Sequence, residues 1–140
     1  ASGFVGPAGA LAIGLTGGFV CFYATILIKH KLKIDDALDV FPVHGVGGVL
    51  GTLLAAVFAS TELGIFSGQG FANESITSIG QQLGIQAIGV GAVFAYTAVV
   101  SFILYKVVGM ITGLRVSPDE ESLGLDINDH EERGYDFVSN

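Results

Sequence analysis

The sequence predicts an all-α membrane protein with three transmembrane helices and an acidic tail. Of its 140 residues, 51% are hydrophobic and only 14% are charged, and the mean hydropathy is +0.66, which is unusual for a soluble domain. A bilayer core of about 30 Å takes about 20 helical residues to cross. Three blocks of at least that length contain no Asp, Glu, Lys or Arg, namely residues 1–28, 40–61 and 75–105.

A soluble core and a signal peptide both fit these blocks less well than membrane spans do. Buried helices of a soluble protein normally keep a polar stripe, which the first and third blocks lack. A secretory signal peptide has a basic first region and a shorter apolar run than this N-terminus. Cys21 is the only cysteine, so the chain cannot form an internal disulfide, and we interpret it as a small packing residue.

We expect residues 1–114 to form the transmembrane part and residues 115–140 a cytoplasmic tail. Pro7 suits the first turn of a helix, where its missing N–H would have no partner in any case. The tail carries eight acidic and two basic residues, a composition that is typical of a solvated, partly disordered segment. The predicted helices lie at about 7–28, 40–60 and 79–114, with a short basic connection at 29–33.

The basic residues indicate the orientation in the membrane. All six lie in the first connection or near and beyond the end of the third helix: Lys29, Lys31, Lys33, Lys106, Arg115 and Arg133. The positive-inside rule therefore places the 29–39 connection and the tail in the cytoplasm, and the 61–78 loop outside it. No basic patch is large enough to suggest a nucleic-acid partner.

Glycines are spaced for close helix packing in the first two predicted helices. Gly14 and Gly18 are four apart, as are Gly47 and Gly51, and small residues at this spacing let membrane helices approach closely. Gly45 and Gly48 belong to the same cluster and receive the same structural interpretation. A phosphate-binding loop is excluded, because these glycines lie within apolar helices and not at strand-to-helix turns.

Two aspartates compete to cap the second helix. A carboxylate at the cap accepts hydrogen bonds from the first free amides and favours the positive end of the helix dipole. If Asp36 is the cap, the missing N–H of Pro42 leaves the Leu38 carbonyl unpaired, whereas with Asp39 as the cap Pro42 falls in the first turn. The position of the proline therefore favours Asp39.

His44 is the one ionisable residue in the second charge-free block. Such a group inside a spanning helix is costly and usually faces a cavity, a pathway or the interior of a bundle. A neutral imidazole both donates and accepts hydrogen bonds, which suits passage of a proton along an apolar pore. The alternative is a packing histidine with a satisfied hydrogen bond. Asp39 and His44 alone are too weak a signal for an enzyme, and no Ser-His-Asp or zinc-protease motif occurs.

Residues 36–48, DALDVFPVHGVGG, resemble the D-x-x-D-V-F-x-V-H-G-x-x-G segment of the ammonium transporter (Amt/Mep/Rhesus) family, which opens the tenth of eleven transmembrane helices. The resemblance covers essentially the whole chain. Ala1, Ser2 and Gly3 with Gly6 resemble the lead into the ninth helix. The sequences GLRV at 113–116 and GLD at 124–126, with His130 and Tyr135, resemble the cytoplasmic tail.

The resemblance implies a role for most of these residues. His44 would be the second of two pore histidines and Val40 a pore-lining residue towards the cytoplasmic exit, while Asp36 and Asp39 would order the helix start. The tail residues expected to be ordered and regulatory are Arg115, Gly124, Asp126 and His130.

The resemblance also implies the partners. The full protein would be a homotrimer in the cell membrane that conducts ammonium or ammonia, with no cofactor or metal and no enzymatic activity. A PII signalling protein could plug the pore from the cytoplasm. The chain lacks tryptophan and a second pore histidine, so we expect it to be the C-terminal part of a longer protein. The alternatives are a membrane ammonium sensor that signals through its tail, and a structural fragment without a site.

Overall fold

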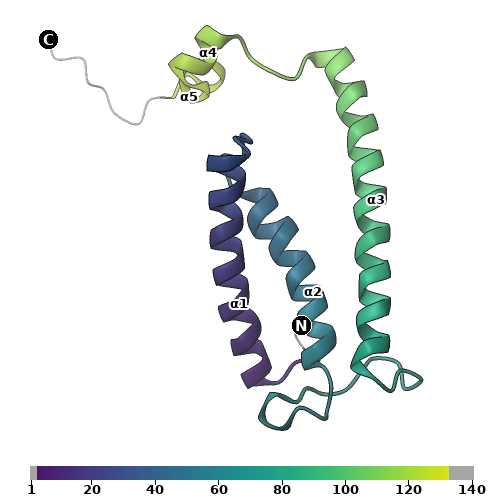
Figure 1. Ribbon diagram of the computed structural model, residues 1–140. Helices are drawn as coiled ribbons and strands as arrows, with labels where there is room; N and C mark the ends of the chain where they lie inside the picture. The colour runs from purple at the N-terminus through teal and green to yellow at the C-terminus, as the bar shows by residue number, and fades with distance from the viewer. Residues whose placement is uncertain (1–2, 133–140) are drawn as a thin grey trace, which may run out of the picture. The chain divides into compact units, whose positions relative to one another are not determined.

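The computed structural model describes residues 3–132, and all regular structure among them is helical (Figure 1). The elements are α1 (Pro7–Ile26), η1 (Leu27–Lys31), η2 (Val40–Val46), α2 (Gly47–Phe58), η3 (Gly64–Phe66), α3 (Ile79–Thr112), α4 (Pro118–Leu123) and α5 (Leu125–His130). The segments η1 and η2 are π-helical, and η3 is a turn of 3-10 helix. The predicted all-α membrane fold is confirmed.

Three helices are long and apolar enough to cross a membrane, judged by length and composition: Pro7–Lys31, Val40–Phe58 and Ile79–Thr112. The second and third match the predicted positions within two residues. The basic connection predicted at 29–33 was wrong in its first part, because Lys29, His30 and Lys31 are helical. Cationic side chains favour the negative end of a helix dipole, so these residues extend the first span.

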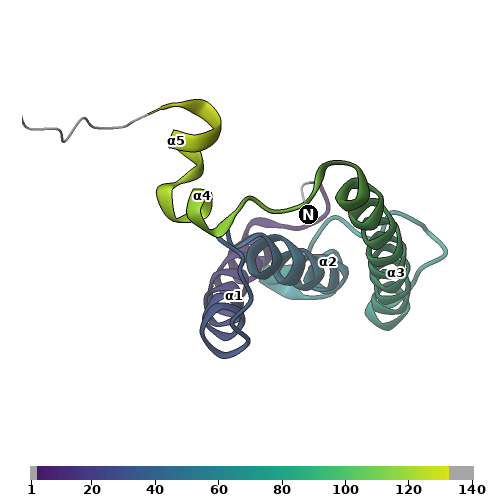
Figure 2. The ribbon, with the colours of Figure 1, turned by 90° about the horizontal axis from the view of Figure 1, so that it is seen from above.

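The chain forms two compact units, residues 1–96 and 97–140. In the first unit, α1 and α2 lie side by side (Figures 1 and 2). Cys21 Sγ lies 4.0 Å from the Val43 carbonyl oxygen, to which it donates a weak hydrogen bond. A Cβ at Gly47 would lie only 2.9 Å from the same sulfur. Gly47 therefore permits the contact between the two spans.

The other glycines of the predicted packing faces have no such neighbour in the described residues. A Cβ added at Gly14, Gly18, Gly48 or Gly51 meets nothing within 4 Å. Within the described residues the two spans therefore approach closely at Gly47, and the packing role of the other glycines stays a prediction. At Gly45 an added Cβ would lie 3.1 Å from the ring of Phe41 in the same helix, so this glycine leaves room for that ring.

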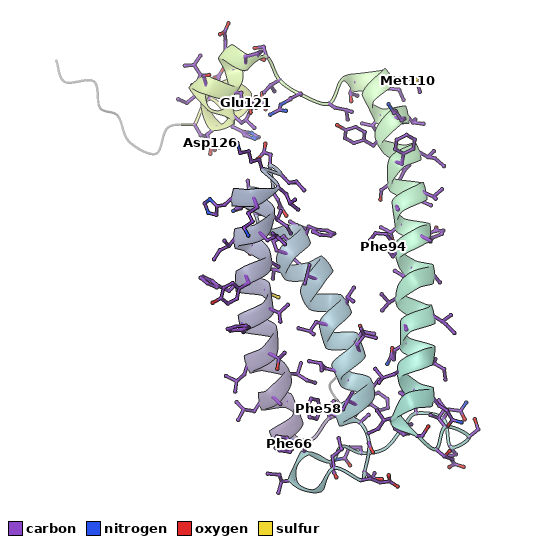
Figure 3. All side chains as sticks on the ribbon, viewed as in Figure 1. Phe58, Phe66, Phe94, Met110, Glu121 and Asp126 are labelled. Carbon is purple, nitrogen blue, oxygen red and sulfur yellow. The ribbon has the colours of Figure 1, made fainter. Side chains whose placement is uncertain are left out.

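Backbone hydrogen bonds fasten the loop after α2 to its surroundings. The amides of Gly68 and Gly70 donate to the carbonyls of Ser60 and Ala59, and the Gln69 amide donates to the Phe4 carbonyl, each at 2.8 Å. The rings of Phe58 and Phe66, labelled in Figure 3, have centroids 6.1 Å apart. The loop thus joins the start of the first span to the end of the second.

The helix α3 carries apolar side chains on all its sides, and none of its residues is buried by the described chain. Figure 3 shows side chains projecting all along it, with Phe94 and Met110 labelled. Lys106 lies near its end, with the ammonium nitrogen 5.6 Å from the centroid of the Phe102 ring, a cation–π contact. A helix that is apolar all round is typical of a membrane span.

We predict that Gly68→Ala destabilises the first unit. An added methyl would collide with the carbonyl oxygens of Phe4 and Phe58 and lie 2.7 Å from the Ala59 Cα. These are backbone atoms that cannot move aside individually, so the expected cost is about 2 kcal/mol or more. Thermal unfolding in detergent measures it. The control is Gly80→Ala, where an added methyl meets nothing within 4 Å. Equal melting temperatures for both variants would contradict the prediction.

Candidate functional site

The start of the second span is built around two carboxylates with different tasks. The two oxygens of Asp36 accept hydrogen bonds from the amides of Val40, at 2.9 Å, and Phe41, at 2.8 Å. Asp39 occupies the residue before the helix, but its side chain makes no capping hydrogen bond. Its Oδ1 instead pairs with Lys29 Nζ at 2.8 Å. The preference for Asp39 as the capping carboxylate was therefore wrong.

The backbone explains why Asp36 can cap without a penalty at Pro42. The helix still begins at Val40, so Pro42 falls in its first turn, where amides lack intrahelical partners. Asp39 itself adopts the left-handed conformation, with φ 55°, and this turn brings the carboxylate of Asp36 to the helix start. The helix therefore begins after Asp39, which keeps Pro42 in the first turn, while the carboxylate that caps it is that of Asp36.

The capping bonds lower the pKa of the Asp36 carboxyl below its ordinary value. The largest cause is the hydrogen bond from the Phe41 amide, followed by that from the Val40 amide. Partial desolvation opposes them, and the positive charge of Lys29 adds a smaller lowering effect. Asp36 is therefore a stable carboxylate at neutral pH, suited to holding amides and not to exchanging protons.

His44 lies in the middle of η2, and its imidazole is exposed. It makes no side-chain hydrogen bond within residues 3–132. Val40 is also exposed, at 52%, whereas Pro42 between them is fully buried. The π-helical turn thus directs Pro42 into the packed interior and leaves Val40 and His44 uncovered by residues 3–132. Segments of π-helix occur frequently at functional sites.

The chemistry available at His44 is hydrogen bonding by the imidazole beside apolar neighbours. Among the described residues, no group of three or more His, Cys, Asp or Glu side chains could hold a metal ion. Gly45 follows the histidine directly, and an added Cβ at Gly48 would meet nothing within 4 Å. The arrangement can pass a hydrogen bond or a proton through the imidazole.

A cavity of about 310 Å³ lies near the loop after α2, and no sequence pattern predicts it. It is lined by Phe4, Gly51, Thr52, Ala55, Ala59, Phe71, Ala72, Gln82 and Gln86. The side-chain oxygen of Gln82 is buried and lacks a hydrogen-bond partner among the described residues. The lining includes none of the predicted site residues.

The predicted tail residues lie in or beside two short helices of the second unit. Ser117 and Glu120 form a capping box, with the Ser117 amide donating to Glu120 at 2.8 Å and the Glu120 amide to Ser117 Oγ at 3.3 Å. The hydrogen bond from the Ser117 amide, followed by that from the Ser117 side chain, lowers the pKa of the Glu120 carboxyl. Arg115 pairs with Glu121 at 3.0 Å. The tail is therefore locally structured at least from residue 117 to 130.

The remaining tail residues have simple positions in these helices. Gly124 joins α4 to α5 with φ 97°, a value that favours glycine. Asp126 lies in the first turn of α5 and His130 is its last residue. Both are exposed. Ala1, Ser2, Arg133 and Tyr135 lie outside the described residues.

Three apolar spans, the second of which begins with a π-helical turn, define an all-helical membrane protein. The family model described as Ammonium Transporter Family matches residues 1–135. The chain belongs to this family. No solved structure matches the chain.

Several curated relatives are ammonium transporters. The chain is 36% identical over 135 residues to the ammonium transporter of Bacillus subtilis, covering 96% of this chain and 32% of the relative. It is 41% identical over 135 residues to ammonium transporter Amt1 of Archaeoglobus fulgidus (96% and 33%). It is 42% identical over 141 residues to a putative ammonium transporter of Methanothermobacter thermautotrophicus (96% and 32%). The chain spans about a third of the length of these relatives.

We predict that Asp36→Ala exposes the first amides of the second span. The amides of Val40 and Phe41 should exchange roughly five-fold faster, because they lose the carboxylate that accepts their bonds. Hydrogen exchange followed by mass spectrometry measures this in lipid nanodiscs. Glu62→Ala is the control, since it removes an exposed carboxylate from the loop after α2 and leaves both capping bonds in place. Unchanged exchange in Asp36→Ala would contradict the capping role.

The same cap has a defined pH dependence. Because the folded pKa of Asp36 is lowered, its contribution to stability is complete above the ordinary aspartate pKa and is lost as the pH falls through the lowered value.

Proposed function

We propose that the protein conducts ammonium across the cell membrane and that this chain supplies one wall of its pathway, with His44 meeting the substrate. The observation that carries the proposal is the uncovered imidazole on a spanning helix of a chain in the Ammonium Transporter Family. The relatives named as ammonium transporters support the substrate.

Physical chemistry supports a pathway at His44. An imidazole with no partner in hydrocarbon carries a large desolvation cost. His44 has none among the described residues, so we infer that it faces polar groups or water supplied by the rest of the protein. By resemblance to the family, we propose that this partner is a second pore histidine elsewhere in the full-length protein. Val40, four residues earlier and also exposed, would line the same path towards the cytoplasm.

In the proposed step, His44 hydrogen-bonds the substrate as the substrate passes along an apolar path. Ammonium must lose its hydration shell to enter, and an apolar wall favours the neutral form, ammonia, over the cation. Neutral imidazole accepts a hydrogen bond at one nitrogen while it donates from the other. It can therefore hold ammonia at a fixed point and accept a proton if the cation releases one.

The orientation follows the basic residues, with the 29–39 connection and the tail in the cytoplasm and the 61–78 loop outside it. The apolar surface of α3 suits contact with lipid. By resemblance we further propose a homotrimer, and a PII signalling protein as a partner of the tail. The surface of the tail presents the Arg115–Glu121 ion pair and the exposed Asp126 and His130. A sensor that signals through the same tail is the second candidate function.

Replacement of His44 tests the pathway. We expect His44→Ala in the full-length protein to change ammonium conduction by about ten-fold or more, because the imidazole contacts the substrate. Ammonium flux into reconstituted liposomes measures this. His30→Ala is the matched control, since His30 lies at the end of the first span. Unchanged flux in His44→Ala, with the protein folded normally, would reject the proposal.

Deletion of residues 115–140 tests the partner. Binding of a PII protein to the full-length transporter on a sensor chip should weaken at least several-fold, because the charged tail surface is lost. Arg115→Ala with Glu121→Ala serves as a milder variant that removes the ion pair but keeps the tail. Full binding by the deletion variant would exclude the tail as a contact site. Normal flux with lost signalling in a tail variant would instead favour the sensor.

A further inference from the structure

We propose that Lys29 is a positioning residue for the pathway, acting through its ion pair with Asp39 on the π-helical turn that carries Val40 and His44. The inference rests on the proposed function, because it assigns Lys29 to the same site. Lys29 lies on the first span and His44 on the second, so the pair links the end of one helix to the start of the other.

The two charged groups are in direct contact, although Asp39 Oδ1 lacks the geometry of a hydrogen bond. Lys29 Nζ and Asp39 Oδ1 are 2.8 Å apart, and about one third of each side chain is exposed. Ile28, next to Lys29, is buried, which anchors that end of η1. The chain then turns back through hydrogen bonds from the Leu32 amide to the Leu27 carbonyl and from the Ile34 amide to the Ile28 carbonyl, at 3.0 and 3.1 Å. The lysine therefore projects from a fixed support.

Asp39 is the residue at which the direction of η2 is set. Its left-handed backbone is uncommon for a residue other than glycine, and its carbonyl accepts the Val43 amide at 3.0 Å. Because Asp36 already caps the first amides, the Asp39 carboxylate is free to bind elsewhere. The ion pair with Lys29 holds Asp39 in this conformation, and the position of His44, five residues later, depends on it.

The simpler alternative is that Lys29 only anchors the span at the membrane surface. Lysines at helix ends commonly extend towards lipid head groups, and such an anchor would work equally well at Lys31. Lys31, the last residue of η1, is exposed and forms no ion pair with any described residue. Comparing the replacement of Lys29 with that of Lys31 therefore distinguishes the role of the ion pair from that of a positive charge at the helix end.

Four variants of the full-length protein in nanodiscs and liposomes test the inference. They are Lys29→Met, Lys31→Met, Lys29→Arg, and the charge swap of Lys29→Asp with Asp39→Lys. In Lys29→Met we expect hydrogen exchange in residues 40–46 to rise roughly two- to five-fold and ammonium flux to fall. Lys31→Met should change neither. Lys29→Arg and the charge swap should restore both at least in part, which a role in lipid anchoring or general packing would not produce.

The outcomes are separable from the test of His44. Unchanged exchange in Lys29→Met, or equal effects in Lys31→Met, would overturn the ion-pair role. Raised exchange with normal flux would overturn the positioning role, provided that His44→Ala loses flux in the same assay. If His44→Ala also keeps normal flux, the proposed function fails, and the positioning role fails with it. Raised exchange with restoration by the swap would still establish the pair itself.

Discussion

The lack of water in the bilayer core is the constraint on which this structure depends. Every amide and carbonyl within a span must find its partner inside the protein, and the ends of the spans are where partners run out. The chain meets this requirement with side chains at one end and with backbone at the other. Asp36 holds the first amides of the second span, and the loop after α2 returns to bond the carbonyls of Ala59 and Ser60.

The same constraint explains what could be predicted from the sequence. A charge within hydrocarbon is so costly that its absence over 20 or more residues identifies a span, and all three predicted spans are present. The ends of the spans were harder to predict, because Lys29 and Lys31 could belong either to the last turn of the helix or to the connection after it. From the sequence we assigned both lysines to the connection, whereas in the structure they are helical and their positive charges stabilise the last turn.

The candidate site was predicted in part. Asp36 and Asp39 were both recognised as candidate caps, but the wrong one was preferred, because residue spacing does not reveal the left-handed backbone of Asp39 or the π-helical turn after it. The partnership with Lys29 was missed. Its only signal is a pair of opposite charges on either side of a short connection. The pathway role proposed for His44 and the regulatory roles proposed for the tail rest on a family resemblance, beside which the structure gives only the exposure of His44 and the local helices of the tail.

The π-helical turn in the second span separates two parts of one helix. An α-helix that ran from Val40 to Phe58 would fix the angular relation between His44 and every packing residue that follows. A π turn closes its hydrogen bonds one residue later, so the phase of the side chains shifts where η2 gives way to α2 at Gly47. Both parts contact the first span, but the turn gives the part that carries the histidine a different angular setting from the part that follows it.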